Sequence, residues 1–119
     1  MSGSERRILQ RFYFVSRADV RFAGGGDPIW GAVANLSRTG VALYIRQPLT
    51  LRSKATIRFR FQSEGGRELT EDVAATIVWQ RGETAGMEFE APLLAGSLAA
   101  LKAPYLSAHL ARKEATAGK

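Results

Sequence analysis

The stretch Ala55-Thr56-Ile57-Arg58-Phe59-Arg60-Phe61 decides the fold, because apolar and polar side chains alternate along it. Successive side chains on a β-strand point to opposite faces of the sheet, so the apolar residues here share one face. The stretch therefore predicts a strand whose inner face packs on a core. Arg58 and Arg60, on the other face, are expected to form an outer basic stripe.

Five further segments alternate in the same way, and turn sequences separate them. The expected strands besides 55–61 are 18–23, 29–36, 41–45, 73–79 and 85–89. Gly24-Gly25-Gly26-Asp27-Pro28 and Ser63-Glu64-Gly65-Gly66 are typical of turns. Six short strands with frequent turns predict a mainly β fold, a six-stranded antiparallel β-barrel, whose closure removes unpaired strand edges.

A C-terminal helical segment follows the strands. After Pro92 the leucines adopt a helical period, which predicts a helix over 93–102 and a second helix, or a kinked continuation, to about residue 113. Pro104 is expected to interrupt it, because proline lacks a backbone donor. The apolar stripe that is expected to cover one mouth of the barrel consists of Leu94, Leu98, Leu101 and Tyr105.

A chain of 119 residues predicts one domain. Residues 1–11 are polar and are expected to form a flexible N-terminal arm, residues 12–113 the barrel with its C-terminal helix, and residues 114–119 a disordered tail. The sequence contains no targeting segment and no apolar run of the roughly 20 residues that a membrane span needs. A cytoplasmic monomer without membrane insertion is therefore expected.

Composition narrows the possible functions. Seventeen Lys and Arg against eleven Asp and Glu give a net charge of +6, which favours anionic partners. The absence of cysteine excludes disulfides, thiolate nucleophiles and cysteine-based zinc sites, and the single histidine, His109, is interpreted as a surface helix residue. No acid–base set is assembled, so an enzyme is not expected. The carboxylates expected to be exposed in or beside turns are Asp27, Glu64, Glu68, Glu71 and Asp72.

Two short motifs have the chemistry of a site for an anionic ligand that bears a base. Arg6-Arg7-x-x-x-Arg11 supplies guanidinium groups, which match phosphate oxygens and the O6/N7 edge of guanine. Asn35-x-Ser37-x-x-Gly40 supplies two short polar side chains that can add hydrogen bonds. Gly40 lacks a Cβ, so it tolerates a positive φ and a close approach to its backbone.

Together these motifs resemble the signature of the PilZ domain, a bacterial receptor module for cyclic di-GMP. Arg7 to Arg11 matches RxxxR, and Asn35 to Gly40 matches [D/N]xSxxG. Val78-Trp79 and the later Gly86-Met87-Glu88-Phe89 are similar to the late strand pair of the family. The resemblance covers about residues 5–100 and implies a PilZ-like split barrel.

The resemblance also implies the ligand and its contacts. Cyclic di-GMP would be bound by Arg6, Arg7, Arg11, Asn35, Ser37 and Gly40, with Arg38 and Trp79 as two further candidates. An arginine at position 6 implies a stacked, intercalated pair of ligand molecules. Binding would order the arm on the barrel and change the contact with a downstream protein that the sequence does not identify. The processes implied are motility, exopolysaccharide or biofilm control.

Two of the candidate residues have alternative interpretations. By alternation with Val73, Ala75 and Ile77, Trp79 is predicted to lie in the core, whereas the resemblance places it near the nucleotide. Arg38 is either a phosphate contact or an ordinary surface residue.

Two other functions remain open. A small basic barrel can bind single-stranded nucleic acid, and then Arg58 and Arg60 would line a groove with Tyr44. No aromatic-rich RNA-binding strand signature supports this function, so nucleic acid is not the expected partner. A PilZ-like adaptor that acts through protein contacts alone is the other possibility.

Overall fold

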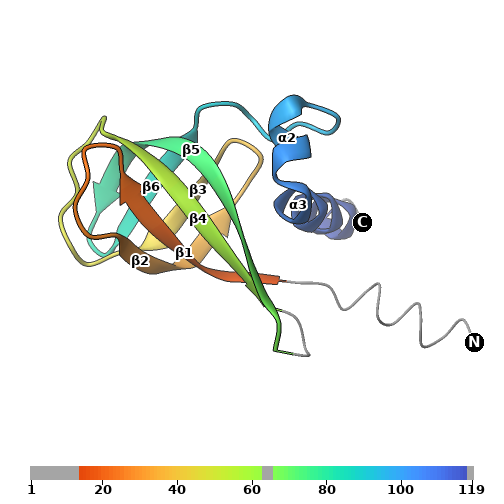
Figure 1. Ribbon diagram of the computed structural model, residues 1–119, viewed down its shortest axis with the longest axis horizontal. Coiled ribbons are helices and arrows are strands. Elements are labelled where there is room, and N and C mark those ends of the chain that lie inside the picture. Colours follow the sequence, from red (N-terminus) through yellow and green to blue (C-terminus); the bar gives the residue numbers. More distant parts are fainter. Residues whose placement is uncertain (1–13, 63–65, 118–119) are drawn as a thin grey trace, which may run out of the picture.

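Within the part of the chain that the structure describes, the protein forms a closed β-barrel with two helices at one end (Figure 1). The computed structural model describes residues 14–62 and 66–117. In chain order the elements are β1 (Phe14–Phe22), β2 (Ile29–Leu36), β3 (Gly40–Tyr44), β4 (Lys54–Gln62), β5 (Glu68–Arg81), β6 (Thr84–Phe89), α2 (Leu98–Lys102) and α3 (Pro104–Ala117). The predicted mainly β, six-stranded fold is confirmed.

The strands follow the order β1-β2-β3-β6-β5-β4 around the barrel, and every neighbouring pair is antiparallel. The barrel closes because β1 pairs with β2 on one side and with β4 on the other, where Ala18 lies opposite Phe59. Closure gives each of the described strands two partners, so none of them keeps a long unpaired edge.

The alternation predicted for β4 is confirmed. Ala55, Ile57, Phe59 and Phe61 are buried, and the residues between them are partly exposed. Phe59 packs edge-on against Phe89, with ring centroids 6.2 Å apart, at the centre of the core. Burying each such ring stabilises the fold by about 2 kcal/mol relative to an exposed side chain. The barrel interior is thus a core packed with side chains.

The helices differ from the sequence prediction at both ends. The first begins at Leu98 rather than at residue 93, because Ser97 caps it by accepting a hydrogen bond from the Ala100 amide at 3.1 Å. The second begins at Pro104, a position where proline costs no helical hydrogen bond. It continues to Ala117, beyond the expected end at residue 113 and into the predicted tail.

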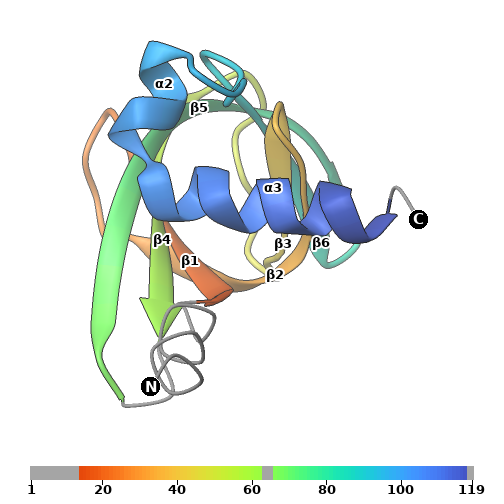
Figure 2. The same ribbon diagram turned by 90° about the vertical axis from the view of Figure 1, so that its right-hand side faces the viewer.

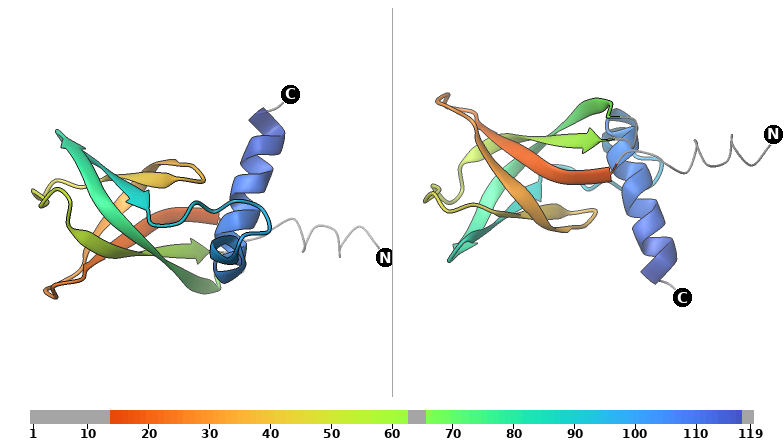
Figure 3. Two further views of the ribbon diagram at one scale, coloured as in Figure 1. Left: turned by 90° about the horizontal axis from the view of Figure 1, so that it is seen from above. Right: turned by 90° about the horizontal axis from the view of Figure 1, so that it is seen from below.

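Figure 2 looks onto one end of the barrel and shows α3 lying across it. The two views in Figure 3 place α2 and α3 together at that same end. Among the described residues, no helix is long and apolar enough to cross a bilayer.

The face of the helices that covers the barrel is not the predicted one. Leu94, Leu98, Leu101 and Tyr105 are 41–68% exposed. The residues that instead pack on the core are Leu93, Ala103, Leu106 and Leu110. The predicted stripe assumes a single helical phase, and the break at Ala103 between α2 and α3 shifts that phase.

A buried carboxylate fastens α3 to the barrel. Glu71 on β5 is 9% exposed, although the sequence predicts an exposed turn residue. Its two oxygens each accept a backbone hydrogen bond at 2.8 Å, from Tyr105 and Leu106. These amides lie in the first turn of α3 and have no partner within the helix. Burial raises the pKa of Glu71, and the two backbone hydrogen bonds oppose that rise.

The other described acidic residues agree with the sequence prediction, whereas the histidine differs from it. Asp27, Glu68 and Asp72 are exposed as expected, and Glu64 lies outside the described residues. His109 is half-buried on α3 rather than a surface residue. Its pKa is lowered by burial and by the nearby charges of Arg112 and Lys113.

Candidate functional site

A shallow cavity of about 230 Å³ lies on the outer face of the barrel, where β2 ends and β3 begins. It is lined by four of the residues proposed from the sequence, namely Asn35, Ser37, Gly40 and Trp79. The structure therefore brings residues 35–40 together with a tryptophan that is about 40 positions away in the chain. Strand β6, which pairs with both β3 and β5, supplies the cavity floor between them.

Asn35 is exposed at the end of β2, next to the buried Leu36. Its Oδ1 accepts a hydrogen bond from the Leu36 amide at 2.9 Å and another from Lys113 Nζ at 3.4 Å. Both contacts use the oxygen of the amide. Among the described residues, neither N–H bond of Nδ2 has an acceptor, so both remain able to donate.

Ser37 forms the turn that joins β2 to β3. Its backbone amide donates to the Gly40 carbonyl at 2.9 Å, and its Oγ accepts from the Thr39 amide at 3.2 Å. These are the hydrogen bonds of an ordinary serine turn. The side chain is nevertheless exposed and lines the cavity, so the turn presents the hydroxyl to the cavity.

Gly40 is required by close packing of two strands. Its φ is not positive, in contrast to the left-handed conformation that the sequence allows for it. A Cβ at this position would lie 2.3 Å from the Met87 carbonyl oxygen on β6. The glycine thus lets β3 approach β6, and this approach shapes one wall of the cavity.

Trp79 is not a core residue. A register shift between Ile77 and Trp79 reverses the alternation along β5, as an extra residue in a β-bulge does. As a result the Trp79 side chain faces outward and is 42% exposed. Its indole lies over Gly86, where a Cβ would come within 2.1 Å of Nε1. The core prediction from alternation is wrong, and the tryptophan instead forms a flat apolar wall of the cavity.

Arg38 points away from the cavity, although it lies inside the motif. Its guanidinium binds both carboxylate oxygens of Glu114 on α3, at 2.7 and 2.9 Å, and also donates to the Leu93 carbonyl. The hydrogen bond to Glu114 raises the pKa of Arg38 and lowers that of Glu114. Arg38 is thus neither an ordinary surface residue nor part of the cavity wall. It joins the motif to α3.

The arginines of the first motif, Arg6, Arg7 and Arg11, lie outside the described residues. The described chain begins at Phe14, at the start of β1. Because β1 and β2 are antiparallel, the start of β1 and the end of β2 lie at the same end of the barrel. The chain therefore enters the barrel at the end that carries Asn35.

Lys113 is a neighbour of the site that sequence reasoning missed. Its Nζ donates to the Leu36 carbonyl at 2.7 Å and lies 3.4 Å from Asn35 Oδ1. The contact with Leu36 joins positions 77 residues apart, and only the packing of α3 across the barrel end creates it. No local spacing in the sequence marks this lysine.

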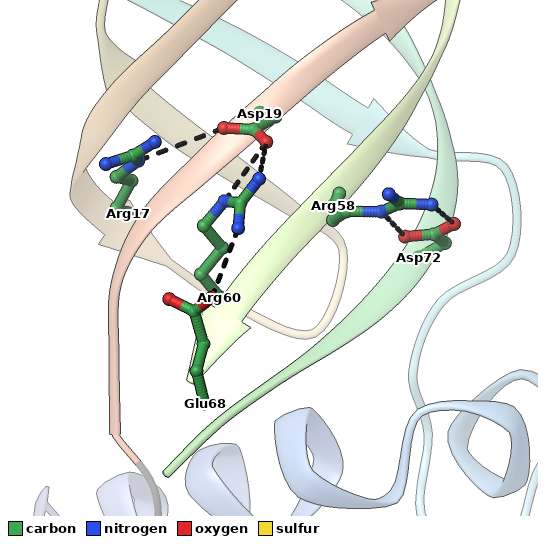
Figure 4. Close-up of polar contacts among 6 residues, drawn as sticks. All are labelled: Arg17, Asp19, Arg58, Arg60, Glu68 and Asp72. Carbon is green, nitrogen blue, oxygen red and sulfur yellow. Dashed lines mark hydrogen bonds and ion pairs between the residues drawn. The ribbon is translucent and has the colours of Figure 1, made fainter. Parts of the chain in front are cut away.

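The arginines expected to form a basic stripe on β4 are paired with carboxylates. Arg58 binds Asp72 through two hydrogen bonds, at 2.8 and 3.0 Å, and this pairing lowers the pKa of Asp72 (Figure 4). Arg60 binds the buried Asp19 at 2.6 Å and Glu68 at 3.3 Å. Both guanidinium groups are therefore occupied by carboxylates.

Tyr44 does not share a groove with these arginines. It lies on β3, between β2 and β6, whereas β4 lies between β1 and β5. The groove expected for single-stranded nucleic acid is therefore not formed. Within residues 14–62 and 66–117, no group of three or more metal-ligating side chains is assembled either.

The sequence matches one known protein family. A family model described as the PilZ domain matches residues 4–103, which include both motifs. A comparison with curated proteins found no significant match. The crystal structure of the PilZ domain of CeSA from a cellulose-synthesising bacterium has a TM-score of 0.48 and 20% identity, over 66% of this chain and 76% of that one. Because the family model spans most of the sequence, the chain belongs to the PilZ domain family.

Proposed function

We propose that the protein is a cyclic di-GMP receptor in which the cavity and the N-terminal arm bind the ligand together. The PilZ domain is a cyclic di-GMP-binding family, and this membership supports the receptor role. One observation of the site carries the proposal: Asn35, Ser37 and Trp79 line a single cavity at the barrel end where the chain enters.

Each described residue of the cavity has a distinct role in this proposal. The Nδ2 group of Asn35 donates to a guanine edge or a phosphate, and the Ser37 hydroxyl adds a second hydrogen bond. Gly40 lets β3 approach β6 and thereby shapes one wall of the cavity. The exposed indole of Trp79 offers a flat surface on which a purine can stack, a contact worth about 1–3 kcal/mol per base.

The arm supplies the positive charge. Arg11 precedes Phe14 by three residues, so at most about 10 Å of extended chain separates it from the start of β1. Arg7 and Arg11 would grip phosphates and guanine edges, and Arg6 would serve a second, stacked ligand molecule. The stoichiometry of a titration shows whether one or two molecules of cyclic di-GMP bind.

The output would be a changed protein contact. An arm that orders on binding loses conformational entropy, which the charge-assisted hydrogen bonds must offset. The ordered arm would alter the surface at the α3 end of the barrel and thereby the contact with a downstream protein. As a receptor for a bacterial second messenger, the protein would act as a cytoplasmic monomer in motility, exopolysaccharide or biofilm control.

Isothermal titration calorimetry with cyclic di-GMP tests the proposal. We expect binding in the micromolar range or tighter, a loss of about 3 kcal/mol in Arg7→Ala or Arg11→Ala, and about 1 kcal/mol in Ser37→Ala. Arg52→Ala is the matched control, because it removes an exposed guanidinium from the β3–β4 connection. No heat of binding from folded protein at tens of micromolar, or equal affinities in all four variants, would refute the proposal.

One observation favours a second candidate, single-stranded nucleic acid binding. Trp30 and Tyr44 are 59% and 56% exposed, and they line a separate cavity of about 570 Å³. The guanidinium of Arg17 lies 4.6 Å from the centre of the Trp30 ring. Exposed aromatic rings beside arginine can stack bases. Oligonucleotide affinity that rises with length and falls steeply with salt would support this function.

A further inference from the structure

The described residues that line the cavity supply no positive charge. Among the described residues that line it, the only charged side chain is the carboxylate of Glu88. A cyclic dinucleotide is an anion, and burying its phosphates against a neutral or acidic wall costs free energy unless a cation is nearby. Apart from Arg38, which Glu114 holds, the described cation that contacts the signature lies on α3.

That cation is Lys113. Its Nζ donates to the Leu36 carbonyl at 2.7 Å and contacts Asn35 Oδ1 at 3.4 Å, and both residues line the cavity. An ammonium group has three donors, so one N–H bond remains beyond these two contacts. The long stem of a lysine lets the charge swing by a few ångströms while the helix stays in place.

The position of Lys113 is fixed by the residue that follows it. Glu114 holds Arg38 of the signature through two hydrogen bonds, at 2.7 and 2.9 Å. Arg38 also donates to the carbonyl of Leu93, a core residue that precedes α2. The last turns of α3 are therefore tied to the motif by a paired guanidinium and carboxylate, and Lys113 is held at the rim of the cavity.

We propose that Lys113 is a further phosphate-binding residue of the dinucleotide site and that the Arg38–Glu114 pair positions it there. This inference rests on the proposed function, since it names a contact of the same site. It assigns α3 a role in binding besides covering the barrel. It also explains why Arg38 turns away from the cavity, since its partner is the helix that brings the lysine.

Calorimetric titration of variants with cyclic di-GMP tests the proposal. Lys113→Met should weaken binding about 10-fold or more, because one charge-assisted contact is lost. Lys113→Gln should weaken it similarly, although glutamine can still donate to a carbonyl. Lys113→Arg should stay within about threefold of the wild type, because the charge is kept. Lys102→Met, which removes an exposed lysine from α2, is the matched control and should stay within about twofold.

Two further measurements separate ligand contact from support of the fold. Glu114→Gln keeps Lys113 but removes the negative charge that binds Arg38, so α3 is held less firmly at the motif. We therefore expect an intermediate loss of affinity of about threefold. The dependence of log K on log salt should be weaker in Lys113→Gln than in Lys102→Met, because one phosphate contact has gone. Thermal unfolding of each variant shows how far the fold itself is affected.

Three outcomes would overturn the proposal while leaving the proposed function intact. The first is that the wild-type protein binds cyclic di-GMP and that Lys113→Met and Lys113→Gln bind it with the same affinity. The second is a loss in Lys113→Met alone, which would assign the lysine a structural role at the Leu36 carbonyl. The third is an equal loss in Lys102→Met, which would reflect overall charge. Failure of the wild type to bind would instead overturn the proposed function, and this inference with it.

Discussion

Gly40→Ala is the sharpest test of how the site is built. The structure attributes the need for glycine at this position to the approach of β3 to β6, and no positive φ is involved. An added Cβ would lie 2.3 Å from the Met87 carbonyl oxygen, whereas ordinary contacts begin at 3.4 Å. The overlap is therefore about 1 Å against backbone atoms, which cannot rotate away.

The size of the effect follows from what must move. Strand β6 is hydrogen-bonded to β3 on one side and to β5 on the other, so relieving the contact disturbs two ladders. Overpacking of this kind typically costs 1–3 kcal/mol, and we expect about 2 kcal/mol in the free energy of unfolding. For a domain of this size the midpoint of thermal unfolding should fall by roughly 8 °C.

Urea unfolding monitored by circular dichroism measures this loss. Gly24→Ala is the matched control, because Gly24 has no positive φ and a Cβ there would meet nothing within 4 Å. The control should change stability by less than about 0.5 kcal/mol. If Gly40→Ala were as stable as Gly24→Ala, the explanation from close strand packing would be wrong.

Three further outcomes test other parts of the molecule. Asp19→Asn removes the buried charge partner of the partly exposed Arg60, which keeps its contact with Glu68, so we expect a loss of about 2 kcal/mol in urea unfolding, and an unchanged stability would contradict a stabilising role for this ion pair. Glu71→Ala leaves two amides of α3 without acceptors, so stability should fall by about 3 kcal/mol and amide exchange in the first turn of α3 should accelerate; unchanged exchange would refute the cap. Burial lowers the pKa of His109 in the folded protein. At pH values just below the ordinary pKa of histidine, the unfolded chain therefore binds more protons than the folded chain, and stability should decline as the pH drops from about 8 to about 5. His109→Gln should reduce that decline, and an identical profile in the variant would assign it to other groups.

The strands were predictable because alternation is a local property of the chain. The inward face of β4 follows directly from the spacing of Ala55, Ile57, Phe59 and Phe61. Trp79 was misplaced because a single extra residue in β5 reverses the alternation, and the sequence carries no local mark of that bulge. The buried face of the helices was mispredicted for a related reason, because the break at Ala103 changes which leucines face the core.

The polar residues were harder to predict, because their partners are distant in sequence. Arg60 finds Asp19 across the β1–β4 pair, 41 positions away, so the expected basic stripe does not exist. Glu71 becomes buried only because α3 begins directly above it. The motif residues 35–40 could be identified from spacing, but Lys113 reaches them only through the packing of α3.

Titration of isotopically labelled protein with cyclic di-GMP, followed by amide NMR, tests the central claim most directly. The account predicts chemical-shift changes that saturate together at residues 5–12 and 35–40 and at the Trp79 indole, with little change at Trp30 on the separate cavity. A folded protein whose amides at 5–12 and 35–40 do not respond to cyclic di-GMP, or respond to GMP equally well, would contradict it.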